Sequence, residues 1–199
     1  LKVFCFSGDG DSLAEGLEHL IFAAKRNIDI TVILHDNRVY GLTTGQYTPT
    51  SPSGFRGKST PAGAVEPPLN PLELMLSSGG TYIARGYSHG IEQLQRLFKE
   101  AILHKGFSFV DVLQVCVSYH NLYESYNQWT YAVEDNDRSS FEQARKIIRS
   151  WNYNRSDLPI PLGCFYQIDA PRFDQSFSSY RPDRRERESK IEEILENFI

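Results

Sequence analysis

The sequence has few cysteines, no long apolar run and no excess of basic residues, and each absence excludes a class of protein. Its three cysteines, Cys5, Cys116 and Cys164, are odd in number and far apart, which argues against a disulfide framework and favours a reducing cytoplasm. No apolar run reaches the roughly 18 residues of a membrane-spanning helix, because Asp29 interrupts the longest, around residues 28–34. With a net charge of −4 and acidic residues between the basic ones, nucleic acid is not an expected partner.

The chain also lacks an initiator methionine and a targeting segment, because it begins with Leu1 inside an apolar run. We therefore expect a fragment or processed product whose N-terminal part is missing. The 199 residues, of which 40% are hydrophobic, are enough for about one globular domain. We expect a single domain over residues 1–199, with a C-terminal extension from about residue 170.

The first 35 residues predict a strand, a helix and a second strand. Residues 1–6 are an apolar run, apolar residues then recur at helical spacing from Leu13 to Ala24 with Ser12 as the cap, and residues 28–34 are apolar and β-branched. Two strands joined by one helix run parallel in a sheet. The expected fold class is therefore α/β, with a parallel sheet.

A segment rich in structure-breaking residues follows. Of the 21 residues from 43 to 63, 15 are Ser, Thr, Pro or Gly, so a long loop is expected, of a kind that is usually functional or disordered. The aromatic residues between 119 and 131 have no basic groove beside them and are expected in the core or a subunit interface. Further strands are expected at 81–84, 107–115 and 163–168, and further helices at 91–102, at 140–151 and around Ile191, Ile194, Leu195 and Phe198.

Gly8-Asp9-Gly10-Asp11 lies where the first strand ends, and open α/β sheets bind ligands beyond the carboxyl ends of their strands. This stretch does not match a dinucleotide-binding fingerprint or an EF-hand, because position 13, where these motifs need a glycine or an oxygen ligand, is Leu13. It does not match a P-loop either, because the Gly-Lys-Ser/Thr sequence is absent. Asn37 follows the second strand. Adjacent parallel strands joined by one helix bring the loops at their carboxyl ends close together. Asp9 and Asn37 are therefore expected to reach one cation, and Mg²⁺ takes oxygen ligands and completes its shell with waters and phosphates.

Gly8-Asp9-Gly10, followed by 26 intervening residues and then Asn37, resembles the thiamine diphosphate-binding motif. The continuation Asn37-Arg38-Val39-Tyr40-Gly41-Leu42-Thr43-Thr44-Gly45-Gln46-Tyr47-Thr48-Pro49-Thr50 is similar to the β subunits of the 2-oxoacid:ferredoxin oxidoreductases. Their pattern there is close to Asn-Asn-x-x-Tyr-Gly-Leu/Met-Thr-Gly-Gly-Gln-x-Ser-Pro-Thr. Residues 84–87, 104–107, 112–117 and 159–163 also agree, so the resemblance covers nearly the whole chain.

The resemblance implies a three-layer fold, with helices on both faces of a mostly parallel sheet, that binds thiamine diphosphate and Mg²⁺. By position, the Mg²⁺ ligands would be the Asp9 carboxylate, the Asn37 side chain and the Val39 backbone carbonyl. The diphosphate would contact backbone amides and a helix N-terminus. Its lining would consist of Gly8, Gly10, Asp11, Gly41, Leu42 and Thr43. For Asp11, a purely structural role in capping amides of the turn has equal weight.

Departures from the family pattern concern the substrate side of the cofactor. Asp36 replaces the first Asn of the usual pair, Thr44 stands where many members have Gly, and Glu15-Gly16 replaces Ile-Gly. None of them removes a predicted Mg²⁺ ligand. Thr44 and Gln46 are the candidates for the substrate side, and the resemblance does not define which 2-oxoacid is used.

Cys116 has two interpretations. A lone cysteine at the end of an apolar strand is more often a small buried hydrophobic residue. In the resembling family, the corresponding cysteine is the fourth ligand of a [4Fe–4S] cluster whose other ligands come from an upstream segment. We therefore expect a cluster only in a full-length parent, and expect Cys5 and Cys164 in the core.

The resemblance implies a subunit of an enzyme that oxidatively decarboxylates a 2-oxoacid, reduces ferredoxin and transfers the acyl group to coenzyme A. An α subunit with the pyrimidine-binding domain would be its partner, so the chain alone is expected to be nearly inactive. No catalytic residue is predicted, and a structural role is favoured for His35. Two alternatives stay open: a non-redox thiamine diphosphate decarboxylase, which needs neither Cys116 nor ferredoxin, and a degenerate assembly domain without cofactor.

Overall fold

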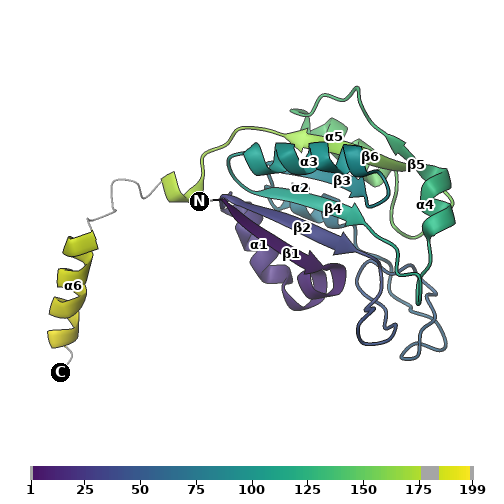
Figure 1. Ribbon diagram of the computed structural model, residues 1–199, viewed down its shortest axis with the longest axis horizontal. Coiled ribbons are helices and arrows are strands. Elements are labelled where there is room, and N and C mark those ends of the chain that lie inside the picture. The colour runs from purple at the N-terminus through teal and green to yellow at the C-terminus, as the bar shows by residue number, and fades with distance from the viewer. Residues whose placement is uncertain (1, 176–183, 198–199) are drawn as a thin grey trace.

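The computed structural model describes residues 2–175 and 184–197, and within them six strands form one sheet in the order β1-β2-β4-β3-β6-β5 (Figure 1). The strands are β1 (Val3–Gly8), β2 (Ile30–Asp36), β3 (Tyr82–Tyr87), β4 (Ser108–Leu113), β5 (Thr130–Ala132) and β6 (Ile160–Gln167). The helices are α1 (Leu17–Lys25), α2 (Pro71–Ser77), α3 (Ile91–Leu103), α4 (Tyr123–Trp129), α5 (Phe141–Arg149) and α6 (Arg184–Glu196), and a π-helical turn, η1 (Asp11–Glu15), precedes α1.

The sheet is mostly parallel, as the sequence predicts. β1 pairs with β2, β2 with β4 and β3 with β4, all in parallel, whereas β6 runs antiparallel to β3 and parallel to β5. The strand–helix–strand units around α1 and α3 are therefore confirmed. β1 is an edge strand of this sheet, and its side chains Val3, Phe4 and Phe6 are exposed.

Helices cover both faces of the sheet because successive strand residues point to opposite sides. On one face, Val32 and Leu34 of β2 pack in a cluster with residues of α1, α2 and α5. On the other face, Ile33 of β2 and Val110 of β4 pack in a cluster with Leu97 and Ala101 of α3. The three-layer arrangement implied by the resemblance is confirmed.

The start of the first helix differs from the prediction. Ser12 is buried inside η1 and caps neither this turn nor α1, which begins after Gly16; both starts lack a side-chain cap. The reason is that Gly10 already has helical backbone angles, with φ −64° and ψ −46°. The chain thus passes from strand to helix without the extended residue that a capping side chain requires.

The remaining predicted positions agree in part. Cys164 is buried in the core and Cys5 is half-buried against it, as expected. Of the aromatic residues at 119–131, Tyr126 is fully buried, whereas Tyr119, Tyr123 and Tyr131 are exposed.

Two residues with predicted positions, Leu1 in a strand and Phe198 in the last helix, lie outside the described residues. The single domain with its extension stays a prediction. Over the described ranges, no helix combines the length and apolar character needed to cross a membrane.

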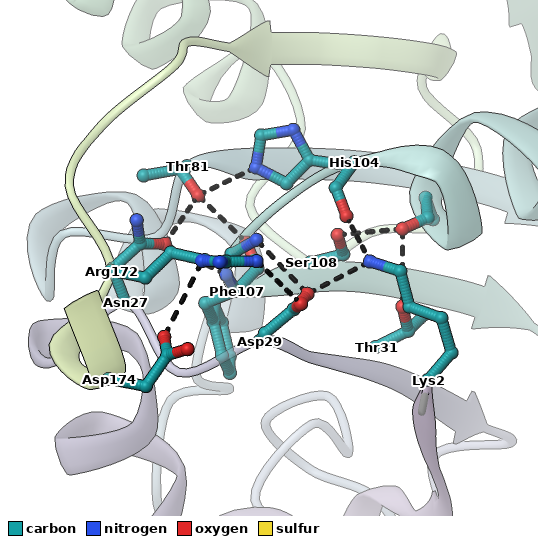
Figure 2. A network of polar contacts seen from close by, with 12 residues as sticks. Lys2, Asn27, Asp29, Thr31, Thr81, His104, Phe107, Ser108, Arg172 and Asp174 are labelled. Carbon is teal, nitrogen blue, oxygen red and sulfur yellow. Dashed lines mark hydrogen bonds and ion pairs between the residues drawn. The ribbon is translucent and has the colours of Figure 1, made fainter. Parts of the chain in front are cut away.

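A polar network lies at the amino end of the strands (Figure 2). Asn27, at a left-handed φ of 46°, accepts hydrogen bonds from the Thr81 hydroxyl and the Phe107 amide, both at 2.8 Å. Asp29 forms ion pairs of 2.9 Å with Lys2 and with Arg172. Asn27 also donates to the Ala170 and Pro171 carbonyls. The network therefore fastens the segment after β6 to the body of the molecule.

Candidate functional site

A cavity of about 330 Å³ opens at the carboxyl ends of β1 and β2. Gly8 of β1 lies opposite His35 of β2 in the parallel register, so the loops that follow the two strands are neighbours. The cavity is lined by Gly8, Asp9, Gly10, Asp11, Glu15, Asn37, Val39, Tyr40, Gly41, Leu42 and Thr43. All nine residues predicted to contact cofactor or Mg²⁺ are in this lining, and Glu15 and Tyr40 are additional.

The two predicted substrate-side residues are not part of this lining. Gln46 contacts a residue of the lining, because its side-chain oxygen accepts a hydrogen bond from the Thr43 hydroxyl at 2.5 Å. Thr44 is exposed and has a left-handed φ of 78°. Their roles toward a substrate stay predictions.

Asp9 is the buried carboxyl group of the cavity, with 2% of its surface exposed. The Thr50 hydroxyl lies 2.8 Å from Asp9 Oδ2. Burial raises the pKa of Asp9 above its usual value, while hydrogen bonds from Thr48, Thr50 and backbone amides oppose that shift. A bound cation would favour the charged form of this carboxyl group.

Asp36, the last residue of β2, is fully buried close to Asp9. Burial, and then repulsion from Asp9 and Asp111, raises the pKa of Asp36 well above its usual value. Its Oδ1 atom lies 2.8 Å from the Thr50 hydroxyl, and no hydrogen-bond partner of its Oδ2 atom is found within the described part of the chain. The Thr50 hydroxyl thus bridges the Asp9 carboxyl group, in the cavity lining, and the Asp36 carboxyl group, behind it.

Arg38 sets the backbone between two predicted ligands. Its φ of 62° is left-handed, which is uncommon outside glycine and requires support from the surroundings. The guanidinium group, 1% exposed, donates to the Thr50 carbonyl at 2.9 Å and to the Tyr153 carbonyl. The residues before and after Arg38 are also hydrogen-bonded to each other, because the Asn37 side-chain oxygen accepts a hydrogen bond from the Val39 amide at 3.0 Å. The bend at Arg38 therefore keeps Asn37 and Val39 together at the cavity.

Deeper in the sheet lies an ion pair that was not predicted from the sequence. Arg85 of β3 and Asp111 of β4 are fully buried, 3.1 Å apart, and both contact the Tyr153 hydroxyl. The signal in the sequence is a single charged residue inside each of two apolar strands. Asp111 also contributes to the raised pKa of Asp36, so this pair is electrostatically linked to the carboxyl group behind the cavity.

A close contact explains Gly10 of the cavity, whereas a Cβ atom on Gly41 would make only an ordinary van der Waals contact. A Cβ atom on Gly10 would lie 2.2 Å from the Tyr40 ring, so that position accepts no larger residue unless Tyr40 moves. A Cβ atom on Gly41 would lie 3.5 Å from the sulfur of Cys116. Cys116, which follows β4 and is half-buried, is therefore next to the cavity. His35 does not line the cavity, and its ring contacts the Gln114 side chain, consistent with a structural role.

The donor atoms suit a hard cation. Among residues 2–175 and 184–197, no three His, Cys, Asp or Glu side chains group so that they would hold a metal ion. A cation in the cavity would therefore need one carboxylate completed by neutral oxygens. Asp9, Asn37 and Val39 offer this set in a cavity with room for phosphate and water, which is the environment that Mg²⁺ prefers.

Known proteins share both the sequence and the fold. Residues 1–112 match the family described as thiamine pyrophosphate enzyme, C-terminal TPP binding domain. A "2-oxoacid:ferredoxin oxidoreductase subunit beta" from Sulfolobus sp is 36% identical, with 100% of this chain and 72% of that protein covered. The protein of that name from Saccharolobus solfataricus is also 36% identical, with 84% of this chain and 58% of that protein covered.

A solved structure agrees with these relatives. It is a 2-oxoglutarate:ferredoxin oxidoreductase from Magnetococcus marinus with 2-oxoglutarate, coenzyme A and succinyl-CoA bound. The TM-score is 0.82 at 33% sequence identity, over 89% of this chain and 61% of that one. The present chain therefore spans only part of the length of these proteins, 58% in the case of the Saccharolobus protein.

Proposed function

The chain belongs to the thiamine pyrophosphate-dependent β subunits of 2-oxoacid:ferredoxin oxidoreductases, and we propose that it binds Mg²⁺ and the diphosphate of this cofactor for oxidative decarboxylation of a 2-oxoacid to acyl-CoA. One observation carries the proposal. Nine residues chosen by sequence position, which come from two loops 26 residues apart, line one cavity at the carboxyl ends of adjacent parallel strands. Ligand sites of open α/β sheets occupy this position.

Each residue of the cavity has a part in this proposal. Asp9, Asn37 and Val39 hold Mg²⁺ through a carboxylate, an amide oxygen and a carbonyl. Gly8, Gly10 and Gly41 let the diphosphate approach the backbone closely, because no Cβ atom stands in the way. Asp11, Leu42 and Thr43 complete the wall. When bound, thiamine diphosphate supplies the nucleophilic carbon and the electron sink that decarboxylation needs.

The partners in the proposal follow from the names of the relatives. A "subunit beta" implies an α subunit, and the oxidoreductase name implies ferredoxin as electron acceptor. The solved relative binds 2-oxoglutarate and coenzyme A, which supports a 2-oxoacid and coenzyme A as substrates here. We include Cys116 in the proposal as a [4Fe–4S] ligand of a full-length parent, on account of its position beside Gly41. The proposal also places the protein in the cytoplasm.

Calorimetric titration tests the proposed cofactor site. Thiamine diphosphate is titrated with and without Mg²⁺ into the chain, alone and in complex with the α subunit. We expect Asp9→Asn, which keeps the shape but removes the charge, to weaken Mg²⁺-dependent binding by about 100-fold, because the single carboxylate of the donor set is lost. Asp135→Asn changes an exposed carboxylate outside the cavity and serves as the matched control.

Two results would contradict the proposal. Equal affinity of Asp9→Asn and the unchanged protein in the complex would remove Asp9 from the metal site. Absence of any Mg²⁺-dependent binding by the complex would favour the cofactor-free assembly domain. Reduction of ferredoxin by the complex separates the oxidoreductase from a non-redox decarboxylase.

A further inference from the structure

Thr50 is one of two buried threonines that hydrogen-bond to Asp9 from outside the cavity lining; the other is Thr48. Thr50 is 0% exposed, and its hydroxyl oxygen is 2.8 Å from Asp9 Oδ2 although 41 positions separate the two residues in the chain. A hydrogen bond from a neutral hydroxyl group fixes the plane of a carboxylate without neutralising its charge. Thr50 is therefore placed to determine how Asp9 faces the cavity.

The backbone around Thr50 is held firmly. Its carbonyl accepts from Arg38 Nε at 2.9 Å, and the Arg38 carbonyl accepts from the Ser51 hydroxyl at 2.6 Å. The Ser51 hydroxyl in turn accepts from the Thr48 amide at 2.8 Å. The turn over residues 48–51 and the bend at Arg38 thus stabilise each other, so the Thr50 hydroxyl has a defined position.

Thr50 also spans the two strands that supply the proposed ligands. Its hydroxyl lies 2.8 Å from Asp36 Oδ1, and Asp36 ends β2 directly before Asn37, whereas Asp9 directly follows β1. One hydroxyl thereby contacts the carboxyl ends of both strands. A change in the spacing of β1 and β2 would alter its two contacts together with the distance between Asp9 and Asn37.

We propose that Thr50 is a positioning residue for the metal ligand Asp9. Its hydrogen bond to Oδ2 acts together with those from Thr48 and the backbone amides to orient the carboxylate toward the cation. Groups that orient metal ligands through hydrogen bonds typically change metal affinity by about 10- to 100-fold when they are removed. This inference rests on the proposed Mg²⁺–diphosphate site, and its test separates failure of one from failure of the other.

The test compares Thr50→Val, which keeps the shape and loses the hydroxyl, with Thr50→Ser, which keeps the hydroxyl. Mg²⁺ is titrated calorimetrically in the presence of thiamine diphosphate, with the chain in its α-subunit complex. We expect Thr50→Val to weaken Mg²⁺ binding by about tenfold or more and Thr50→Ser to restore most of it. In an Asp9→Asn background, Thr50→Val is expected to cause no further loss, because the ligand on which it acts is already altered.

Controls separate positioning from folding. Ser51→Ala removes hydrogen bonds of the same turn without touching Asp9, and thermal unfolding reports the stability of each variant. Thr50→Cys, with a weaker donor of similar size, should give an intermediate affinity and replaces Thr50→Val if that variant does not fold.

Two outcomes would overturn the inference: unchanged Mg²⁺ affinity in Thr50→Val while Asp9→Asn is impaired, or an equal loss in Ser51→Ala. If Asp9→Asn also binds normally, the proposed cation site itself is wrong.

Discussion

Thr44 illustrates how backbone geometry constrains a single position near the site. Its φ of 78° lies in the left-handed region, and Gly45 follows with φ 102°. For a β-branched residue this conformation is strained, whereas glycine adopts it freely. The resembling family often has glycine at this position, and the structure supplies a conformational reason for it that does not involve substrate.

We expect Thr44→Gly to raise the free energy of unfolding by about 1 kcal/mol. Release of left-handed strain exceeds the additional entropy that glycine gives the unfolded chain. Urea unfolding followed by circular dichroism measures the change. Thr43→Gly is the matched control, because Thr43 has no positive φ and should lose stability. A loss of stability in Thr44→Gly would show that the threonine side chain makes a compensating contact.

At the same scale, the sequence defined the cavity lining well and its supports poorly. Asp9, Asn37 and their neighbours belong to two short motifs that follow adjacent parallel strands, so position along the chain was sufficient to bring them together. Thr50 and Arg38 act through contacts that depend on how the loop folds back, which no local pattern encodes. The buried pair of Arg85 and Asp111 likewise depends on β3 lying beside β4.

At the scale of elements, the longer strands and helices were predictable, whereas the short elements α2, α4 and β5 were missed. α2 has seven residues, too few for a clear helical period, and it follows the long loop directly. The sequence does carry a signal for the N-terminus of α2: Asn70 is a capping residue that accepts a hydrogen bond from the Glu73 amide, and Pro71 occupies the first turn. The long loop itself is as expected, because the described chain has neither helix nor strand between β2 and α2. The antiparallel direction of β6 arises from tertiary pairing with β3.

Asn70 connects two helices, and its substitution tests the importance of that connection. Its side-chain oxygen caps α2, and its amide lies 3.3 Å from the Ile148 carbonyl of α5 and 3.4 Å from the Trp151 carbonyl. We expect Asn70→Ala to lower the free energy of unfolding by about 1–2 kcal/mol. Asn70→Asp keeps the cap but loses the amide donor, so an intermediate loss is expected in urea unfolding. Equal stability of all three proteins would contradict a linking role.

At the scale of the whole molecule, two histidines make stability depend on pH. Burial lowers the pKa of His104, which contacts Thr81 in the polar network of Figure 2. Burial and the charge of Arg38 lower the pKa of His120 to about 4. Because the unfolded chain binds these protons near pH 6.5, their contribution to stability is present above that pH and is lost as the pH falls toward about 4.

We expect the contribution of His120 to reach about 3 kcal/mol above pH 6.5. Urea unfolding across this pH range measures it, and His120→Leu should flatten the dependence. His19→Gln, at an exposed position on α1, is the control. If His120→Leu shows the same slope as the unchanged protein, His120 does not carry the effect.

The edge position of β1 has a consequence for how ligand and fold affect each other. Edge strands are among the first segments to open in local unfolding, and Asp9 directly follows this strand. Each opening of β1 would separate Asp9 from Asn37 and abolish the cavity. A ligand held by both loops therefore stabilises the pairing of β1 with β2 against local opening. We expect this stabilisation to be measurable as slower amide hydrogen exchange along β1 when the ligand is bound.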